Sequence, residues 1–526
     1  MKKILIAILF IFIALSFVTL PRNPLLNDDA ALYALAAKNA ILYNQWLAQF
    51  VTPGDLSSFL DKPPLGIWLL AVIPKITGIN ELTIHFPNVI YYGLLLLLLY
   101  TSLSGLASKR IALYSTLIAA TSLALVVYSR APKLDVLLTL FVLAAHFCLY
   151  AFLKTEKPIH LYILAFLLAL GFLVKSGFGI LVPGLTVLGL LIFNPEARSK
   201  LLKFAFSLNS VFCLLIFISI TGVVLGLQSL SLKAYWLPYL KSITIQSKYN
   251  VGYLGFGINY SIIGLLLITI FPWSPLFLTS LKFRLSRKMN LNIFCNYWFW
   301  ANFLFLFFFY RQTDFRTFTV LVPPLAILAG IKLHSLNLYP QKGKIPIILW
   351  SIFFLFIFSV ILMAGILNPV NPEGIDISAA ISPVFLFVVS LIFLTAYFWK
   401  PTDLKLSTAF LLVCLSYGVL FYNTLSLAKA FNSDAEWPAL IKKHQQKGYA
   451  FYIYRPPDRK LFMSPDLFYV DFISGPADQY FWDRAQFIKK LSFGKAIILS
   501  DTASWHKLNL KGEIIAQDSY SSLILR

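Results

Sequence analysis

The sequence predicts an α-helical polytopic membrane protein of about thirteen transmembrane helices with a small external C-terminal α/β domain. Of the 526 residues, 59% are hydrophobic and 13% are charged, and the mean hydropathy is +0.77. Soluble proteins carry roughly 25% charged residues, so this composition excludes an ordinary soluble enzyme. Apolar runs long enough to cross a membrane recur through residues 1–425, and residues 426–526 lose the pattern. We therefore expect a transmembrane domain over 1–425 and an external domain over 426–526.

The first transmembrane helix is expected at 4–20, after the basic pair Lys2-Lys3. No small-x-small cleavage pattern precedes Pro21, so we expect an uncleaved helix rather than a signal peptide. The other apolar runs, of roughly 17 to 25 residues, are expected to form the remaining spans. They lie near 86–105, 111–128, 134–153, 159–174, 178–194, 204–227, 258–281, 292–310, 316–335, 345–367, 379–398 and 406–425.

Lysine and arginine residues concentrate in every second loop between these runs. The positive-inside rule assigns such loops to the cytoplasm, which places the N-terminus inside and, with an odd number of spans, the C-terminal domain outside. The net charge of +22 therefore indicates orientation in the membrane and contact with anionic lipids, not nucleic-acid binding. The basic loops contain Lys109, Arg110, Lys154, Lys157, Arg198, Lys200, Lys203, Lys282, Arg284, Arg287, Lys288, Lys332, Lys342, Lys344, Lys400 and Lys405.

Three segments are not expected to span the membrane and are expected outside it: 21–85, 228–257 and 426–526. In the last segment, short strand-like runs separated by Pro, Gly and charged residues predict an α/β domain, which either caps the protein or binds substrate. Those runs lie at 449–454, 467–472, 496–500 and 514–516. In the first segment, apolar side chains on one helical face predict an amphipathic helix in the membrane interface. They belong to Leu32, Leu35, Ala36, Leu42, Tyr43 and Trp46.

Two carboxylates follow the first span. Asp28 and Asp29 precede the predicted amphipathic helix, and residues 29–33 read Asp-Ala-Ala-Leu-Tyr. A charge near membrane depth is costly, so charged residues that remain there are candidates for function. The structural alternative is that one of them, Asp28 in particular, only caps the positive N-terminal end of that helix.

A second motif is Asp61-Lys62-Pro63-Pro64. Two consecutive prolines force a rigid, extended backbone, which suits a lysine that must hold a phosphate group. The alternative is an interfacial loop in which the lysine side chain extends toward the lipid headgroups.

A third motif is the short external loop that contains Arg130, Lys133 and Asp135, followed by an almost purely apolar run. A carboxylate in that position either pairs with a nearby cation or helps to form a site. Other external cations lie at span ends, where a single one is more often an anchor than a ligand. They are Lys175, Lys248, Arg311 and Arg316.

Taken in this order, the three motifs resemble those of the type C membrane glycosyltransferases (GT-C). The likeness is to the bacterial aminoarabinose transferases of lipid A and to the protein O-mannosyltransferases, in glycosyltransferase families 39 and 83. The family's Asp-x-x-x-Tyr pattern matches 29–33, although Ala30 and Leu32 replace an acidic residue and an arginine. Its acidic-Lys-Pro-Pro pattern matches 61–64, and its Arg-then-Asp pattern matches 130–135.

Weaker matches to the same family follow along the chain. Residues 175–177 resemble its Lys-Gly turn, 271–273 its Pro-Trp turn, and 315–324 an aromatic stretch that ends in Pro-Pro. Lys248, before Tyr249, corresponds by position to an arginine that lies near the lipid phosphate in the family.

The resemblance implies a GT-C fold and a sugar donor attached to a polyprenyl phosphate in the outer leaflet. The acceptor, on lipid A, a protein or another glycan, would attack the anomeric carbon with inversion. We expect Asp29 to act as the base, with Asp28 sharing that role, and Asp135 to position a neighbour or the sugar. The residues expected to bind the lipid phosphate are Lys62, Asp61, Lys248 and Arg130.

Two other classes of protein share parts of this pattern. A transporter or lipid flippase is also polytopic, but its ionisable residues typically lie at the membrane midplane on broken helices, not at external ends. A purely structural or binding membrane protein is the second alternative. A divalent cation bound by Asp28, Asp29 and Asp135 is conceivable, but no His or Cys spacing supports a dedicated site. We expect no cofactor and no obligatory metal.

Overall fold

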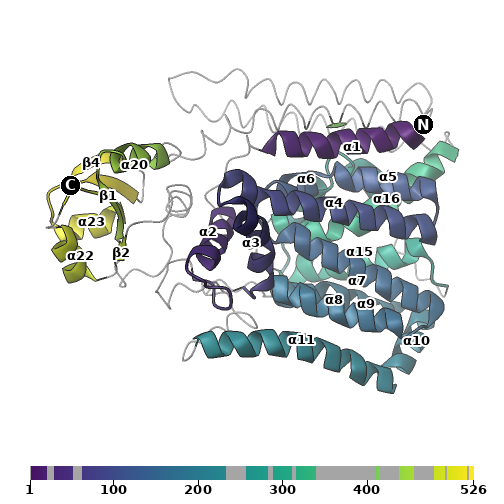
Figure 1. Ribbon diagram of the computed structural model, residues 1–526. Coiled ribbons are helices and arrows are strands. Elements are labelled where there is room, and N and C mark those ends of the chain that lie inside the picture. The colour runs from purple at the N-terminus through teal and green to yellow at the C-terminus, as the bar shows by residue number, and fades with distance from the viewer. Residues whose placement is uncertain are drawn as a thin grey trace.

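The computed structural model describes residues 2–20, 29–50, 62–232, 256–281, 288–310, 315–338, 410, 413–414, 417, 437–454, 479–481, 483–491, 494–517 and 521–526. These residues form a long helical bundle and a smaller sheet with helices around it (Figure 1). The N-terminus lies at the end of the bundle that faces away from the sheet. The C-terminus lies in the sheet part.

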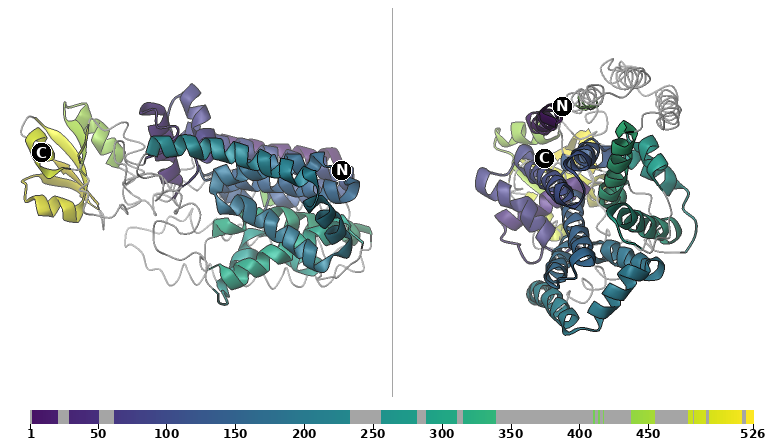
Figure 2. Two further views of the ribbon diagram at one scale, coloured as in Figure 1. Left: turned by 90° about the horizontal axis from the view of Figure 1, so that it is seen from below. Right: turned by 90° about the vertical axis from the view of Figure 1, so that its right-hand side faces the viewer.

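The helices of the bundle lie side by side along its length (Figure 2). They are α1 (Lys2–Val18), α4 (Glu81–Leu106), α5 (Lys109–Ala120), α6 (Leu123–Ser129), α7 (Asp135–Thr155), α8 (Ile159–Lys175), α9 (Gly177–Phe193), α10 (Pro195–Ala205), α11 (Leu208–Leu232), α13 (Ser261–Thr269), α14 (Ser274–Ser280), α15 (Leu291–Phe309), the 3-10 helix η4 (Phe315–Leu321) and α16 (Val322–Leu338). The helix α7 packs against α4 and α8, and α16 packs against α5 and α15.

Most predicted spans in the described residues are confirmed as helices. The runs at 134–153, 159–174, 178–194 and 292–310 correspond to α7, α8, α9 and α15. Five described helices are long and apolar enough to cross a membrane, or up to seven if each of two bent pairs is one span. The predicted spans at 345–367 and 379–398 lie outside the described residues, so the total of thirteen stays a prediction.

Two predicted spans are broken rather than continuous. The run 111–128 forms α5 and α6, which bend by 62° at Thr121, and the run 258–281 forms α13 and α14. The breaks meet each other: the amide of Leu123 donates to the carbonyl of Phe271 at 2.9 Å, and Trp273 Nε1 donates to Thr121 Oγ1 at 2.8 Å. Hydropathy does not detect such a break, because the residues on both sides stay apolar.

Side-chain caps fix where several helices begin. Asn80 and Thr83 form a reciprocal capping box at α4, and Ser108 and Asn290 accept bonds from the first turns of α5 and α15. By contrast α7, which begins at Asp135, has no side-chain cap. Another part of the protein must therefore set the start of α7.

Two shorter helices, α2 (Asp29–Leu42) and α3 (Leu65–Thr77), pack together at the end of the bundle nearer the sheet (Figure 1). A helix was expected at α2, but its environment differs from the predicted interfacial one. It is buried around nearly its whole circumference, and only its end at Leu42 and Tyr43 is exposed. Small alanine side chains let neighbouring helices approach from every side, and such packing cannot be deduced from periodicity.

The described C-terminal residues form short helices and one five-stranded sheet. Its sheet has the strand order β2-β1-β3-β5-β4, with β1, β2 and β3 parallel and β5 antiparallel to both β3 and β4. Of the predicted strands, 467–472 lies outside the described residues, and β2 and β5 were not predicted. The elements are α20 (Trp437–Gln445), β1 (Ala450–Tyr454), β2 (Gln479–Phe481), α22 (Arg484–Leu491), β3 (Ala496–Asp501), α23 (Thr502–Leu508), β4 (Glu513–Gln517) and β5 (Ser521–Leu525).

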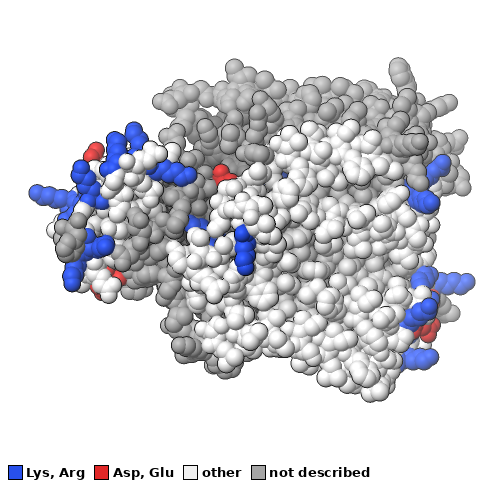
Figure 3. All heavy atoms as spheres, in the orientation of Figure 1, with Lys and Arg blue, Asp and Glu red and all other residues white. Residues whose placement is uncertain are grey.

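On the face shown in Figure 3, most charged side chains lie toward the two ends of the molecule, and the described surface of the bundle between them is largely uncharged. The bundle end that faces away from the sheet carries basic residues from loops predicted to be cytoplasmic. They include Lys109, Arg110, Lys154, Lys157, Arg198 and Lys203. The helix α10, which was not predicted, bends by 117° from α9 at this end.

Candidate active site

The described candidate residues gather at the opposite end of the bundle, nearer the sheet. The start of α3 and the residue before Asp135 are in contact there, because a Cβ added to Gly66 would lie 2.8 Å from Leu134 Cδ2. The start of α7 and the end of α8 are adjacent, and η4 packs against both α6 and α7. Motifs that are far apart in the sequence therefore meet at one end of the bundle.

Asp29 is the first residue of α2, and its carboxylate forms an ion pair with the guanidinium of Arg316 in η4. The two side chains are 32% and 22% exposed, so solvent or a substrate can reach both. The sequence suggested Arg316 only as an anchor. Its place in the aromatic stretch 315–324 was the one signal that marked it.

Asp135 forms a second ion pair at the same end. Its Oδ1 lies 2.5 Å from Nζ of Lys175, the last residue of α8. Here the carboxylate is nearly inaccessible, with 3% of the side chain exposed, and the lysine is 16% exposed. A charge pair this deep is expected to hold two helix ends together and to set the local field.

The turn that carries Lys175 is held by two glycines. A Cβ on Gly179 would lie only 2.2 Å from the carbonyl carbon of Gly171, so α8 and α9 approach backbone to backbone beside the turn. Ser176, between the two helices, has a φ of +48°. The sequence Lys-Ser-Gly thus forms a tight hairpin that aims Lys175 at the start of α7.

Lys62 stands immediately before Pro63 and Pro64, and α3 begins at Leu65. Both prolines are buried, whereas Lys62 is half-buried. The extended backbone predicted for this segment is not found at Pro64, whose φ of −78° and ψ of −21° are helical because it directly precedes the first turn of α3. Asp61, like Asp28 and Lys248, lies outside the described residues, and the roles of these three residues stay predictions.

Arg130 has contacts that the sequence did not suggest. Its guanidinium donates to the carbonyls of Ser16 at 2.7 Å and Thr19 at 3.0 Å, and to Thr19 Oγ1 at 2.9 Å. Burial lowers the pKa of Arg130 to about 10, so the group stays charged at neutral pH. A cation among the last carbonyls of α1 stabilises that helix end. The predicted contact of Arg130 with a phosphate stays a prediction.

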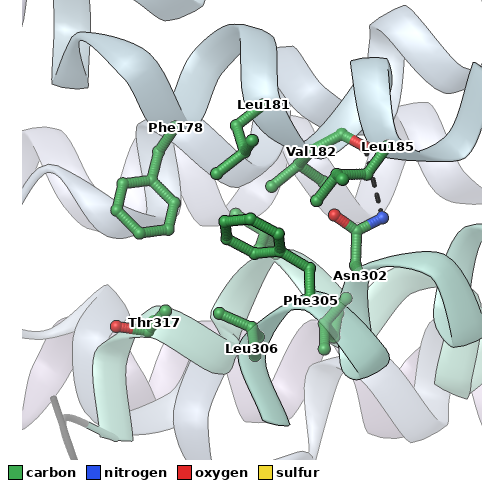
Figure 4. A pocket seen from close by; sticks show the side chains of 10 residues that line it. Phe178, Leu181, Val182, Leu185, Asn302, Phe305, Leu306 and Thr317 are labelled. Atoms are coloured by element: carbon green, nitrogen blue, oxygen red, sulfur yellow. Dashed lines mark hydrogen bonds between the residues drawn. The ribbon is translucent and has the colours of Figure 1, made fainter. Parts of the chain in front are cut away.

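An apolar crevice lies close to these pairs (Figure 4). It is lined by α9, α15 and η4, and its walls begin at Phe178, three positions after Lys175, and at Thr317, next to Arg316. Asn302 lies against it and donates to the carbonyl of Val182 at 3.2 Å. Its free volume is about 10 Å³, the room of one water molecule.

No group of three or more His, Cys, Asp or Glu side chains that could hold a metal ion occurs in the described part of the chain. The expectation that no metal is obligatory stays a prediction.

Comparison with known proteins identifies the fold. Residues 61–221 match the model of the dolichyl-phosphate-mannose-protein mannosyltransferase family. The structure is similar to crystal structures of ArnT from Cupriavidus metallidurans in the apo state and bound to undecaprenyl phosphate, with TM-scores of 0.74 and 0.73. Sequence identity is 16% in each case, over 99% of this chain and 97% of that one. The chain has the fold of a GT-C glycosyltransferase.

The GT-C resemblance predicted from the motifs is therefore confirmed. The family match begins at the Asp-Lys-Pro-Pro motif and includes Arg130, Asp135 and Lys175. A protein of Aquifex aeolicus (strain VF5), described only as uncharacterized, is 26% identical over 357 residues, which are 67% of this chain and 68% of that one.

Proposed function

We propose that the protein is a glycosyltransferase that moves a sugar from a polyprenyl-phosphate donor to an acceptor at the outer face of a bacterial inner membrane. The observation that carries this proposal is the meeting of two aspartate–cation pairs and Lys62 at one end of a GT-C bundle. The acceptor is a hydroxyl or phosphate group of lipid A, a protein or another glycan.

The donor class is supported by charge and by similarity. ArnT, which has the same fold, has been crystallised with undecaprenyl phosphate. A phosphate that leaves with an additional negative charge needs fixed cations, and Lys62, Lys175 and Arg316 supply them at this end of the bundle. Lys62 is the cation we assign to the phosphate, because it directly precedes Pro63 and Pro64, whose rings restrict the backbone there.

The reaction requires one bond to form as another breaks. The acceptor oxygen attacks the anomeric carbon, the bond from that carbon to the phosphate oxygen breaks, and polyprenyl phosphate leaves with the electron pair. Asp29 takes the proton of an acceptor hydroxyl, because it is the accessible carboxylate of the two pairs. Arg316 holds that carboxylate in one orientation. Attack from the face opposite the phosphate inverts the configuration.

The apolar crevice is the proposed entrance for the polyprenyl chain. It adjoins Arg316 and the Lys175 turn, so a phosphate near these cations would have its apolar chain directed between α9, α15 and η4. With a free volume of about 10 Å³ the crevice accommodates no isoprene unit, so α9 and η4 must separate when the donor binds.

The proposed orientation rests on charge. The site lies at one end of the bundle, and the short basic loops between its helices lie at the other. The basic side chains at the sheet end in Figure 3 belong to the C-terminal part, which the rule for short loops does not count. By the positive-inside rule the basic end is cytoplasmic, as is the N-terminus, which makes the site and the C-terminal domain external.

The transporter alternative is not favoured. Transport sites gather ionisable groups at helix breaks near the midplane. The breaks between α5 and α6 and between α13 and α14 are closed by hydrogen bonds to each other, and residues 120–123 and 270–273 include no charged side chain.

The test compares transfer of labelled sugar from membrane polyprenyl phosphates by wild type, Lys62→Ala and Lys203→Ala proteins at matched expression. Lys203 is an exposed lysine at the opposite end of the bundle, so its variant is the control. We expect Lys62→Ala to lower turnover roughly a hundredfold and to leave the lipid-linked donor accumulated. If the wild-type protein leaves the donor pool unchanged, the proposed function is wrong.

A further inference from the structure

The loop between α6 and α7, residues 130–134, lies between two candidate site residues, because it begins with Arg130 and Asp135 follows it. Within it, the amide of Lys133 donates to the carbonyl of Ala131, and the amide of Arg130 donates back to Val127. The next residue, Asp135, begins α7 without a side-chain cap. The loop therefore depends on contacts from other helices for its shape.

Asn88 contacts the loop from α4. It lies on α4 with 0% of its surface exposed, and its Nδ2 donates to the carbonyls of Tyr128 at 3.3 Å and Lys133 at 2.7 Å. The same nitrogen also contacts the carbonyl of Ala131. One amide from a neighbouring helix thus gathers three carbonyls from the end of α6 and the α6–α7 loop.

Two further contacts hold the loop from other sides. The side chain of Arg130 binds the end of α1, and Leu134 packs against Gly66 at the start of α3. Immediately after the loop, Asp135 meets Lys175 at 2.5 Å. A shift of the loop therefore moves the start of α7 and changes this ion pair.

We propose that Asn88 is a positioning residue, whose side-chain amide fixes the α6–α7 loop so that Asp135 meets Lys175 in the geometry that sugar transfer requires. The inference rests on the proposed function. An amide is the suitable group here because carbonyl oxygens need a donor. A carboxylate of the same shape would face three carbonyls with no hydrogen to offer.

The experiment uses full-length protein in lipid nanodiscs, with the variants Asn88→Asp and Asn88→Ala. The control is Asn296→Asp, since Asn296 is similarly buried and its amide donates to Asn292 on its own helix. If either Asn88 variant fails to fold, Asn88→Ser, which keeps a single donor, replaces it. Thermal unfolding checks that the compared proteins are folded.

The first measurement is hydrogen exchange of the peptide that contains 128–138, which does not depend on catalysis. We expect roughly tenfold faster exchange in both Asn88 variants and no change in Asn296→Asp. Unchanged exchange in the Asn88 variants would show that the amide does not hold the loop, and the proposal would fail.

The second measurement is kcat and KM for the lipid-linked donor. We expect kcat to fall roughly tenfold to a hundredfold, with KM within about threefold of wild type. In an Asp135→Asn background the Asn88 substitution should cost little more, because both act through one ion pair. Equal losses with and without Asp135 overturn the positioning role. Absence of transfer by wild-type protein refutes the proposed function instead, and the exchange result then still decides whether Asn88 holds the loop.

Discussion

The two aspartate–cation pairs of the site have similar composition, but their carboxylates differ in accessibility. Asp29 and Arg316 are 32% and 22% exposed, whereas Asp135 is 3% and Lys175 is 16% exposed. An accessible carboxylate can exchange a proton with a substrate directly, whereas the carboxylate of Asp135 faces Lys175 and is almost closed to solvent. Under the proposed function, the accessible pair does the chemistry and the buried pair positions it.

The sharpest test of this comparison is Asp29→Asn. We expect turnover to fall roughly a hundredfold to ten-thousandfold, because an amide cannot accept the acceptor's proton. The melting temperature should change little, since a half-exposed ion pair contributes at most about 1 kcal/mol. Transfer assays and thermal unfolding measure both. Near-normal turnover in a folded variant removes Asp29 from the mechanism.

Asp135→Asn should lower stability clearly, in contrast to Asp29→Asn. Removing one partner leaves Lys175 poorly solvated, and we expect the free energy of unfolding to fall by about 3 kcal/mol. Replacing both partners, as Asp135→Asn with Lys175→Met, should restore most of that stability but not the activity. If Asp135→Asn alone is as stable as wild type, the ion pair does not hold α7 and α8 together.

The smallest effect is expected from Gly179→Ala. Its new Cβ would lie 2.2 Å from the Gly171 carbonyl carbon, so α8 and α9 must separate, at a cost of about 1 to 3 kcal/mol. Activity should fall several-fold as Lys175 shifts. The matched control is Gly184→Ala on the same helix, where a Cβ meets nothing within 4 Å. Equal melting temperatures for the two variants would contradict the close approach.

The sequence predicted best where one physical signal dominates. Helices α7 and α8 were found because each is a single uninterrupted apolar run. The run at 258–281 is equally apolar yet contains a break at the Pro-Trp turn 271–273, which the family resemblance marked and hydropathy did not. Hydropathy indicates whether a segment lies in lipid or in water, but not which other segments it contacts.

The candidate site shows the same limit. The three motifs pointed to Asp29, Lys62 and Asp135 because charge beside an apolar run is rare and costly. The pairing of Asp29 with Arg316 depends on tertiary packing between segments far apart in the chain, and no local pattern encodes it. Asn88 was missed for a related reason, since a single buried amide inside a long apolar helix resembles an isolated polar residue.

The contact between the two broken helices has a consequence for biosynthesis. The amide of Leu123 and the hydroxyl of Thr121 find their partners in Phe271 and Trp273, and the second pair is separated by 152 residues. At about 5 to 20 residues per second, synthesis of the chain between Thr121 and Trp273 takes roughly ten to thirty seconds. During that interval the backbone amide of Leu123 lacks its partner at Phe271, and an amide without a hydrogen bond is costly in lipid. We therefore expect the newly made N-terminal helices to stay at the insertion machinery until the second half of the protein emerges.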